Sequence, residues 1–329
     1  MYNDISYVKT RASFAIANKE NKYSGTQILS IPRQLKKGAR AFQLNVFTDS
    51  KQKGVREQIQ VCFPDCDGIR GGTLYDNLVM FSGWLDENLT DVITIFIENK
   101  GGVGIELISQ IFKESGLNKF IFPSNKRPPY TPWPTLLEMI KINQRLVVFE
   151  EKNDILAPNS DWIFSSRTHI LQYDFSKDYL ENKYIASPYS GDQIVSLTEI
   201  PHYGTNINSP VDNFNFPIQS NISQAKYMNS ESLYLHSVTC LSSNTIVWGN
   251  FLLLDFFGIG NVDSILLGLN SVPLPNDTIS AYYPDFFEQS TPNITRIFEK
   301  IRNSSKKRAY VWYIILYANI FSTLVLTII

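Results

Sequence analysis

The feature that most constrains the fold of this chain is a series of short apolar runs separated by stretches with helical periodicity. Runs such as VITIFI (92–97) and FLLLDFF (251–257) are apolar along almost their whole length. Strands of this kind are buried on both faces, as in parallel sheets covered by helices. The expected strands are Ser6–Lys9, Ala41–Phe47, Gln58–Phe63, Asp91–Ile97, Arg145–Glu150, Trp162–Ser165, Ile194–Ile200 and Phe251–Asp255.

Alternation of strands and helices from residue 6 to residue 255 predicts a parallel α/β fold. Eight strands are enough for a (β/α)8 TIM-type barrel, which typically takes about 250 residues. A doubly wound open sheet fits the same pattern nearly as well. Hydrophobic residues make up 43% of the chain and its net charge is -1, so a full core is available and nothing favours a nucleic-acid partner.

The end of the chain has a different character. Residues 310–329, YVWYIILYANIFSTLVLTII, contain no charged side chain, and about 20 apolar residues are enough for a helix to cross a bilayer core. The sequence therefore predicts three parts: a barrel over 1–272, a juxtamembrane connection over 273–309, and a transmembrane helix over 310–329 that anchors the protein at its C-terminus.

The residues leave open the side of the membrane on which the barrel lies. Lys306, Lys307 and Arg308 precede the apolar segment, and the positive-inside rule then favours a tail anchor with a cytosolic barrel. The start, MYNDISYVKT, shows no signal peptide, although the choice of starting Met could have missed one upstream. A glycolipid-anchor signal is a third alternative, and the short polar spacer after Asn303–Ser305 fits it less well.

Cysteines and glycosylation sequons bear on the same question. Cys62 and Cys66 lie close together and Cys240 lies far away, which is not a zinc pattern. Reduced thiols and a local disulfide are equal alternatives on the spacing alone. Five sequons permit, without requiring, a glycoprotein of the secretory pathway, at Asn88, Asn221, Asn276, Asn293 and Asn303.

Several segments, taken in order, resemble the phosphatidylinositol-specific phospholipase C X-domain family. YNDISYVKTRAS (2–13) is similar to its first strand, and SIPRQLKKGARAFQLNV (30–46) to its second helix–strand element. IQVCFPDC (59–66) is similar to its third strand in secreted fungal members, the phospholipase C-like phosphodiesterases with a TIM-type barrel. The resemblance covers about residues 2–270; it also implies a Cys62–Cys66 disulfide and narrowly favours the secretory pathway or cell surface.

The resemblance implies a chemistry in which a neighbouring inositol hydroxyl attacks a phosphodiester. One His removes the proton from that hydroxyl and a second His protonates the leaving alcohol, which is general acid–base catalysis near neutral pH. An Arg in bacterial members, or calcium in eukaryotic ones, stabilises the anionic transition state.

The positions of the two catalytic histidines are both replaced in this chain. The first falls on Arg11, and the metal-binding Asn beside it falls on Ala12. The second falls on Phe63. Arg stays protonated and cannot act as a base, and neither Phe nor Ala offers a group that exchanges protons or binds a metal.

The positions that stabilise the phosphate are altered as well. The acidic residues of the second strand fall on Gln43 and Asn45, and Asn45 also takes the place of the bacterial Arg. Glu98 alone matches a calcium ligand, whereas calcium prefers about six to eight oxygens. Asp255 is at the end of the last expected strand, and bacterial members place an acid late in the barrel that supports the first His. We therefore expect no calcium or other cofactor and no metal site.

These substitutions predict a membrane-anchored pseudoenzyme whose partner is the lipid bilayer, with a phospholipid headgroup as a second candidate partner. Arg11 could bind a headgroup phosphate through its fork, but a salt-bridged Arg in a dead pocket is the preferred interpretation. The alternative is an active phosphoric diester hydrolase that cleaves phosphoinositide or glycosyl-phosphatidylinositol lipids with other residues. His169, His202 and His236 match no motif; His202 is placed where it could face the barrel mouth.

Overall fold

The computed structural model describes residues 1–17, 25–126, 133–151, 155–172, 197–203, 222–234, 237 and 249–270. The chain divides into two compact units, Met1–Leu266 and Leu267–Ile329, and the fold below is that of the first. No helix in the described ranges is long and apolar enough to cross a membrane. The predicted connection and transmembrane helix, 273–309 and 310–329, lie outside those ranges.

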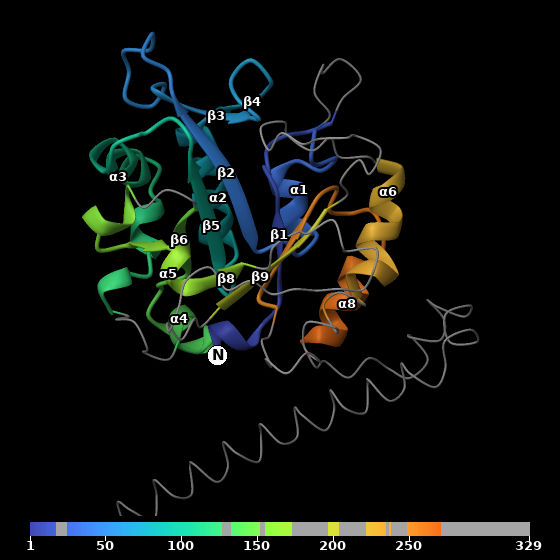
Figure 1. Ribbon diagram of the computed structural model, residues 1–329. Helices are drawn as coiled ribbons and strands as arrows, with labels where there is room; N and C mark the ends of the chain where they lie inside the picture. Colours follow the sequence, from blue (N-terminus) through green and yellow to red (C-terminus); the bar gives the residue numbers. More distant parts are fainter. Residues whose placement is uncertain are drawn as a thin grey trace, which may run out of the picture. The chain divides into compact units, whose positions relative to one another are not determined.

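Eight parallel strands follow one another in a curled sheet whose order is β7-β6-β5-β2-β1-β10-β9-β8 (Figure 1). Their order around the sheet is their order along the chain, as in a TIM-type barrel. No β7–β8 pairing occurs among the described residues, and the four-residue helix α5 (Ser166–His169) connects the two strands. The strands are β1 Tyr7–Thr10, β2 Ala41–Thr48, β5 Ile93–Asn99, β6 Leu146–Glu151, β7 Ile163–Ser165, β8 Ile170–Gln172, β9 Leu197–His202 and β10 Phe251–Leu254.

The remaining elements connect these strands. An antiparallel pair, β3 (Ile59–Phe63) and β4 (Ile69–Thr73), extends from the end of β2, because Val46 pairs with Val61. The helices are α1 Ile31–Lys36, α2 Leu74–Glu87, α3 Ile105–Glu114, α4 Leu136–Lys141, α6 Ile222–Tyr227 and α8 Val262–Leu269. Shorter helical turns are η1 Tyr2–Asp4, η2 Leu117–Phe120, η3 Ser124–Lys126, η4 Ala157–Asn159 and η6 Met228–Ser232.

Seven of the eight expected strands coincide with strands of the parallel path. The expected strand Gln58–Phe63 is instead β3, which is antiparallel and lies off the path. The eighth path strand is the three-residue β8, which the sequence analysis did not include. The barrel expected from the sequence is therefore confirmed in part, because its ring of parallel strands is interrupted between β7 and β8.

Local sequence signals explain where the longest helix begins. Thr73 is the N-cap of α2, and its hydroxyl oxygen accepts a hydrogen bond from the Asp76 backbone N–H at 3.0 Å. This bond satisfies one of the donors that the first helical turn leaves free. One face of α2 is buried through Leu74, Leu78, Phe81 and Leu85, which have the spacing of an amphipathic helix.

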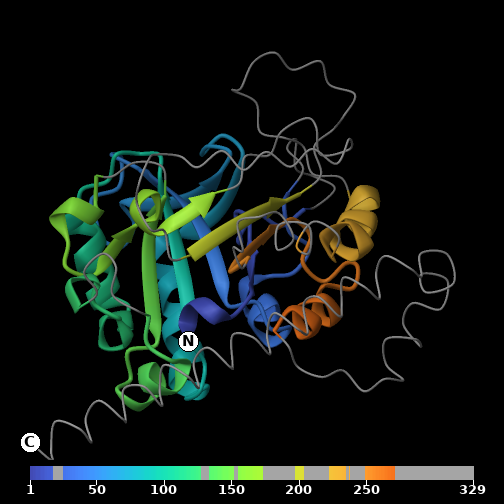
Figure 2. The ribbon, with the colours of Figure 1, turned by 60° about the horizontal axis from the view of Figure 1, so that its bottom comes forward.

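The interior of the barrel changes character along the strand direction. At the N-terminal end, aromatic side chains close the bottom, where Tyr2 packs against Trp133 with ring centroids 4.8 Å apart and the rings tilted; the N-terminus lies at this end in Figure 2. Side chains two residues further along each strand share a face. Toward the C-terminal end the interior residues become charged, from Tyr7 to Lys9, from Phe96 to Glu98 and from Phe149 to Glu151.

Candidate functional site

Arg11 and Asp255 meet at the C-terminal end of the strands, where barrel enzymes place their functional groups. Arg11 follows β1 and Asp255 follows β10, and these two strands are paired in parallel. The guanidinium donates from Nε to Asp255 Oδ1 at 2.8 Å and from Nη2 to Asp255 Oδ2 at 2.6 Å. Both residues are buried, so the pair is a bidentate, desolvated ion pair of the strong type.

Aromatic rings surround the same guanidinium. Its Cζ lies 4.3 Å from the ring centroid of Tyr203 and 5.4 Å from that of Phe63, both within cation–π range. The two positions at which the family's histidines are expected are therefore in contact through Arg11 and Phe63. Burial by itself lowers the pKa of Arg11, but the charge and hydrogen bonds of Asp255 raise it more, so the net shift of the pKa is upward.

The residue that follows each partner of this ion pair has a strained backbone. Ala12 has φ +36° and Phe256 has φ +51°, in the left-handed region that costs an L-residue about 1–2 kcal/mol. Two buried residues hold both turns. Thr26 donates its hydroxyl to Arg11 O at 2.8 Å and accepts from Phe256 N at 2.6 Å through its backbone O. Gln27 donates Nε2 to Arg11 O at 3.0 Å and accepts from Phe257 N at 3.1 Å.

The residues at the positions expected to have lost the calcium site are hydrogen-bonded to one another in pairs. Asn45 donates its Nδ2 to Glu98, and Gln43 accepts from Ala12 N at 3.0 Å. The Asn45 amide thus turns a donor, not an oxygen, toward Glu98, which does not fit a calcium ion that requires converging oxygens. No group of three or more His, Cys, Asp or Glu side chains that could hold a metal occurs among the described residues.

Lys9 forms a second charged cluster that the sequence analysis missed. Its Nζ donates to Glu151 and to Glu199, and it lies 3.5 Å from the ring centroid of Phe96. Gln43 Nε2 also donates to Glu151, at 2.6 Å. Burial alone lowers the pKa of Lys9, but the charges and hydrogen bonds of the two carboxylates raise it above its ordinary value. The sequence signal that could have found this cluster is the two-residue period of a strand, which places Lys9 on the same strand face as Arg11.

The ionisable groups that meet in these two clusters are of both signs. Lys100 Nζ lies 3.8 Å from Glu98 at the edge of the interior. The cations are Lys9 and Arg11, and the carboxylates are Glu98, Glu151, Glu199 and Asp255.

The histidines do not contribute to this cluster in the described structure. His202 is fully buried, and its Nε2 lies 2.9 Å from the Met228 carbonyl oxygen. Glu199 reaches the interior Lys9, so the alternation of β9 turns His202 to the outer face and away from the expected barrel mouth. His169 Nδ1 lies 3.0 Å from Ser165 O at the end of α5. His236 lies outside the described residues.

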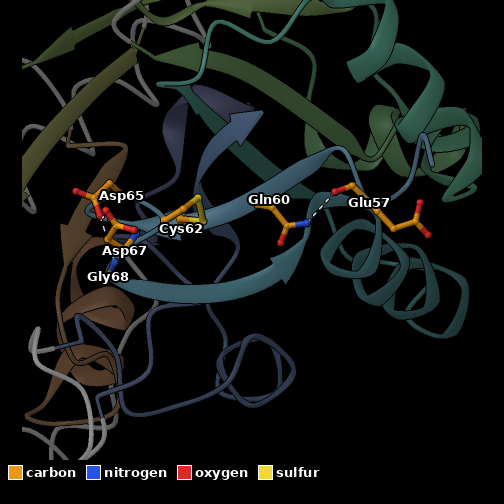
Figure 3. Close-up of a disulfide and its surroundings, with 7 residues drawn as sticks. Glu57, Gln60, Cys62, Asp65, Asp67 and Gly68 are labelled. Atoms are coloured by element: carbon orange, nitrogen blue, oxygen red, sulfur yellow. Dashed lines mark hydrogen bonds between the residues drawn. A yellow bond between two sulfur atoms is a disulfide. The ribbon is translucent and has the colours of Figure 1, made fainter. Parts of the chain in front are cut away.

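Cys62 and Cys66 form a disulfide, as the family resemblance implies, with Cα atoms 4.9 Å apart. It closes the turn between β3 and β4, in which Asp65 Oδ1 accepts from Asp67 N at 3.0 Å and from Gly68 N at 3.2 Å (Figure 3). Phe63, which contacts Arg11, lies within the loop that the disulfide closes.

Comparison with known proteins establishes the family. The PI-PLC X family model matches residues 1–270, and the chain belongs to this family. An uncharacterized secreted protein of Arthroderma benhamiae is 24% identical over 295 residues, which cover 80% of this chain and 59% of that protein. A PI-PLC X domain-containing protein of Arabidopsis thaliana is 25% identical over 323 residues, covering 89% and 68%.

Solved structures agree on the fold. The phosphatidylinositol-specific phospholipase C of Listeria monocytogenes superposes with a TM-score of 0.52 at 11% identity, over 80% of this chain and 93% of that one. A variant of the Staphylococcus aureus enzyme gives a TM-score of 0.52 at 12% identity, over 82% and 93%. The first unit therefore has the phospholipase C-like TIM-barrel fold.

Proposed function

We propose that this chain is a phospholipase C-like barrel that has lost the family's phosphodiesterase chemistry and serves as a membrane-anchored binding or scaffold protein. The observation that carries the proposal is the Arg11–Asp255 ion pair packed against Phe63. General acid–base catalysis needs two groups that exchange protons near neutral pH. The positions of both catalytic histidines are filled here by side chains that do not.

A phosphoinositide assay tests the proposal directly. Purified protein is incubated with phosphatidylinositol and with glycosyl-phosphatidylinositol substrates, with and without calcium, beside an active bacterial family member. We expect no turnover, and we expect none from the double variant Arg11→His/Phe63→His, because Gln43 and Asn45 still replace the phosphate-stabilising residues. Wild-type turnover in the ordinary enzymatic range, about 1–10³ per second, would instead support the alternative, an active hydrolase with non-standard residues.

Binding of a phosphorylated headgroup is a question separate from catalysis. Arg11 already donates Nε and Nη2 to Asp255, so an anionic phosphate has to compete with this carboxylate for the same donors. Calorimetric titration with a soluble inositol phosphate measures this. We expect no heat of binding for the wild type, and a measurable affinity would restore the headgroup hypothesis.

Membrane anchoring through residues 310–329 is part of the proposal. The length and lack of charge of the segment support it, and similarity to a fungal protein named as secreted favours the secretory side. Carbonate extraction compares the full chain with one truncated after Ala309. We expect the full chain to stay with the membrane and the truncated chain to be released; equal release of both chains contradicts the anchor.

A further inference from the structure

We propose that Asn88 carries an N-linked glycan, and hence that this barrel is exposed to the lumen of the secretory pathway. Asn88-Leu89-Thr90 is the one sequon of the five whose Asn lies within the described residues. A sequon alone is weak evidence, but its setting here provides three independent observations. The inference does not depend on whether the barrel is catalytic.

The amide of Asn88 has a free position for a sugar. Asn88 is the C-cap of α2 and is half-buried, while Leu89 and Thr90 are exposed. Asn88 Nδ2 donates one hydrogen bond, to Trp84 O at 2.9 Å. Because an amide nitrogen carries two hydrogens, a glycan can replace the second hydrogen while the first keeps its bond to Trp84.

The turn that carries the sequon is fixed to the barrel. Arg145 Nη1 donates to Asn88 O at 3.0 Å and to Asp91 O at 3.3 Å, and Nη2 donates to Leu85 O at 2.8 Å. These bonds hold the turn at the N-terminal end of β5, which begins at Ile93. Glu98 lies at the opposite end of the same strand, so a glycan on Asn88 leaves the charged interior site unobstructed.

Exposed apolar side chains flank the attachment point. Leu89 is 68% exposed, more than any other large hydrophobic residue among those described, and Ile142 is 58% exposed. Their chain neighbours Asn88 and Asn143 both contact the Arg145 side chain, whose Nε donates to Asn143 Oδ1 at 2.9 Å. The two side chains thus flank one turn of the surface, and a bulky, solubilising glycan there shields them from water and from other chains.

The modification is a transfer from a lipid-diphosphate-linked oligosaccharide supplied by the host cell. The bond between the sugar's anomeric carbon and the diphosphate oxygen breaks, and a bond from that carbon to Asn88 Nδ2 forms. The nitrogen loses one proton, and the lipid diphosphate leaves with the bonding electrons. No oxidant or reductant takes part.

The test uses the full chain produced in yeast, with Thr90→Ala and Thr90→Ser as matched variants. Site-resolved mass spectrometry follows the peptide that contains Asn88, before and after treatment with a glycan-releasing amidase that converts a glycosylated Asn to Asp. We expect occupancy in the wild type and in Thr90→Ser, which keeps the sequon, and none in Thr90→Ala. An unmodified Asn88 in the wild type overturns the proposal, whether or not other sequons are occupied. Phosphodiesterase assays on the same sample separate this outcome from the proposed function.

A second measurement tests the shielding. Glycosylated and enzymatically deglycosylated wild type are compared for aggregation by light scattering, and we expect several-fold faster aggregation without the glycan. In Leu89→Ser, which keeps the sequon but removes the most exposed apolar side chain, the difference should be much smaller. Equal aggregation of the two wild-type forms contradicts the shielding role.

Discussion

At the scale of single residues, Arg11 is the side chain on which the character of the site depends. A buried cation is costly unless it is paired, and Asp255 pairs it through two hydrogen bonds. The same acid is expected in bacterial relatives to support a catalytic His. In this chain the carboxylate instead stabilises a permanently charged group.

Replacing Asp255 tests the energetic weight of that pair. Asp255→Asn leaves the Arg11 charge buried without its counter-ion, and removal of one partner of a buried pair typically costs about 3–5 kcal/mol. Urea denaturation measures the free energy of unfolding. The matched control is Asp263→Asn, which breaks the exposed Lys37–Asp263 pair and should cost less than about 1 kcal/mol. Equal losses in the two variants contradict the buried-pair interpretation.

The backbone at Ala12 gives a prediction of opposite sign. At φ +36° a glycine avoids about 1–2 kcal/mol of left-handed strain, which exceeds the roughly 0.8 kcal/mol lost with one buried methyl group. Ala12→Gly should therefore raise the free energy of unfolding slightly, by less than about 1 kcal/mol, once the greater freedom of glycine in the unfolded chain is subtracted. Ala41→Gly, in the regular strand β2 and equally buried, should lower it, and destabilisation in both variants would contradict the strain argument.

At the scale of elements, β1 determines which charges enter the barrel. Its alternation directs Tyr7, Lys9 and Arg11 to one face, and the neighbouring strands supply the partners. Glu151 ends β6 and Glu199 lies in β9, so one lysine connects three strands that are distant along the chain. The polar layer is thus a product of strand order as much as of residue type.

Lys9→Met should destabilise the barrel strongly. It leaves Glu151 and Glu199 buried without their shared cation, a change that typically costs about 3–5 kcal/mol. The triple variant Lys9→Met/Glu151→Gln/Glu199→Gln removes the uncompensated charges and should recover part of the loss. Denaturant midpoints of the three proteins check this order, and a triple variant no more stable than Lys9→Met would show that charge burial is not the cause.

At the scale of the whole molecule, three buried groups bind protons more tightly in the folded state. Burial, reinforced by the charges of Tyr2 and Asp4, raises the pKa of Tyr7. The pKa values of Lys9 and Arg11 are raised as well, because their carboxylate partners outweigh the opposing effect of burial. A group whose folded-state pKa is raised stabilises the fold fully below its unfolded pKa and loses that contribution as pH rises through the folded value.

Stability should consequently fall above about pH 10, where tyrosine and lysine side chains of the unfolded chain begin to lose protons. The measurement is the urea midpoint at a series of pH values from neutral to strongly alkaline. Tyr7→Phe removes one of these groups, together with the 3.1 Å hydrogen bond from its hydroxyl to Tyr2 O. The urea midpoint of this variant should be lower at neutral pH and should decline less steeply as the pH rises. A midpoint constant through this range contradicts the prediction.

Much of the fold could be predicted from the sequence because barrel strands are local patterns. A run such as FLLLDFF is apolar on both faces wherever it occurs, and the order of the runs along the chain is also their order around the sheet. The prediction that Arg11 and Phe63 stand at the histidine positions likewise came from the sequence, since residue identity at a motif position needs no three-dimensional information, and it stays a prediction. The strand β3 was assigned to the barrel because an apolar run does not reveal whether the neighbouring strand that pairs with it is parallel or antiparallel.

The partners of the charged residues were decided only by the tertiary structure. Arg11 and Asp255 are separated by 244 positions, and Lys9 and Glu151 by 142. Neither pairing has a local signal, because strand curvature and order bring these residues together. The environment of His202 was decided in the same way, because one step along β9 changes the face on which a side chain lies, and this His is packed on the outer face. The sequence by itself determined which side chains follow each strand, and the packing of the barrel determined that Arg11 and Asp255 form an internal ion pair.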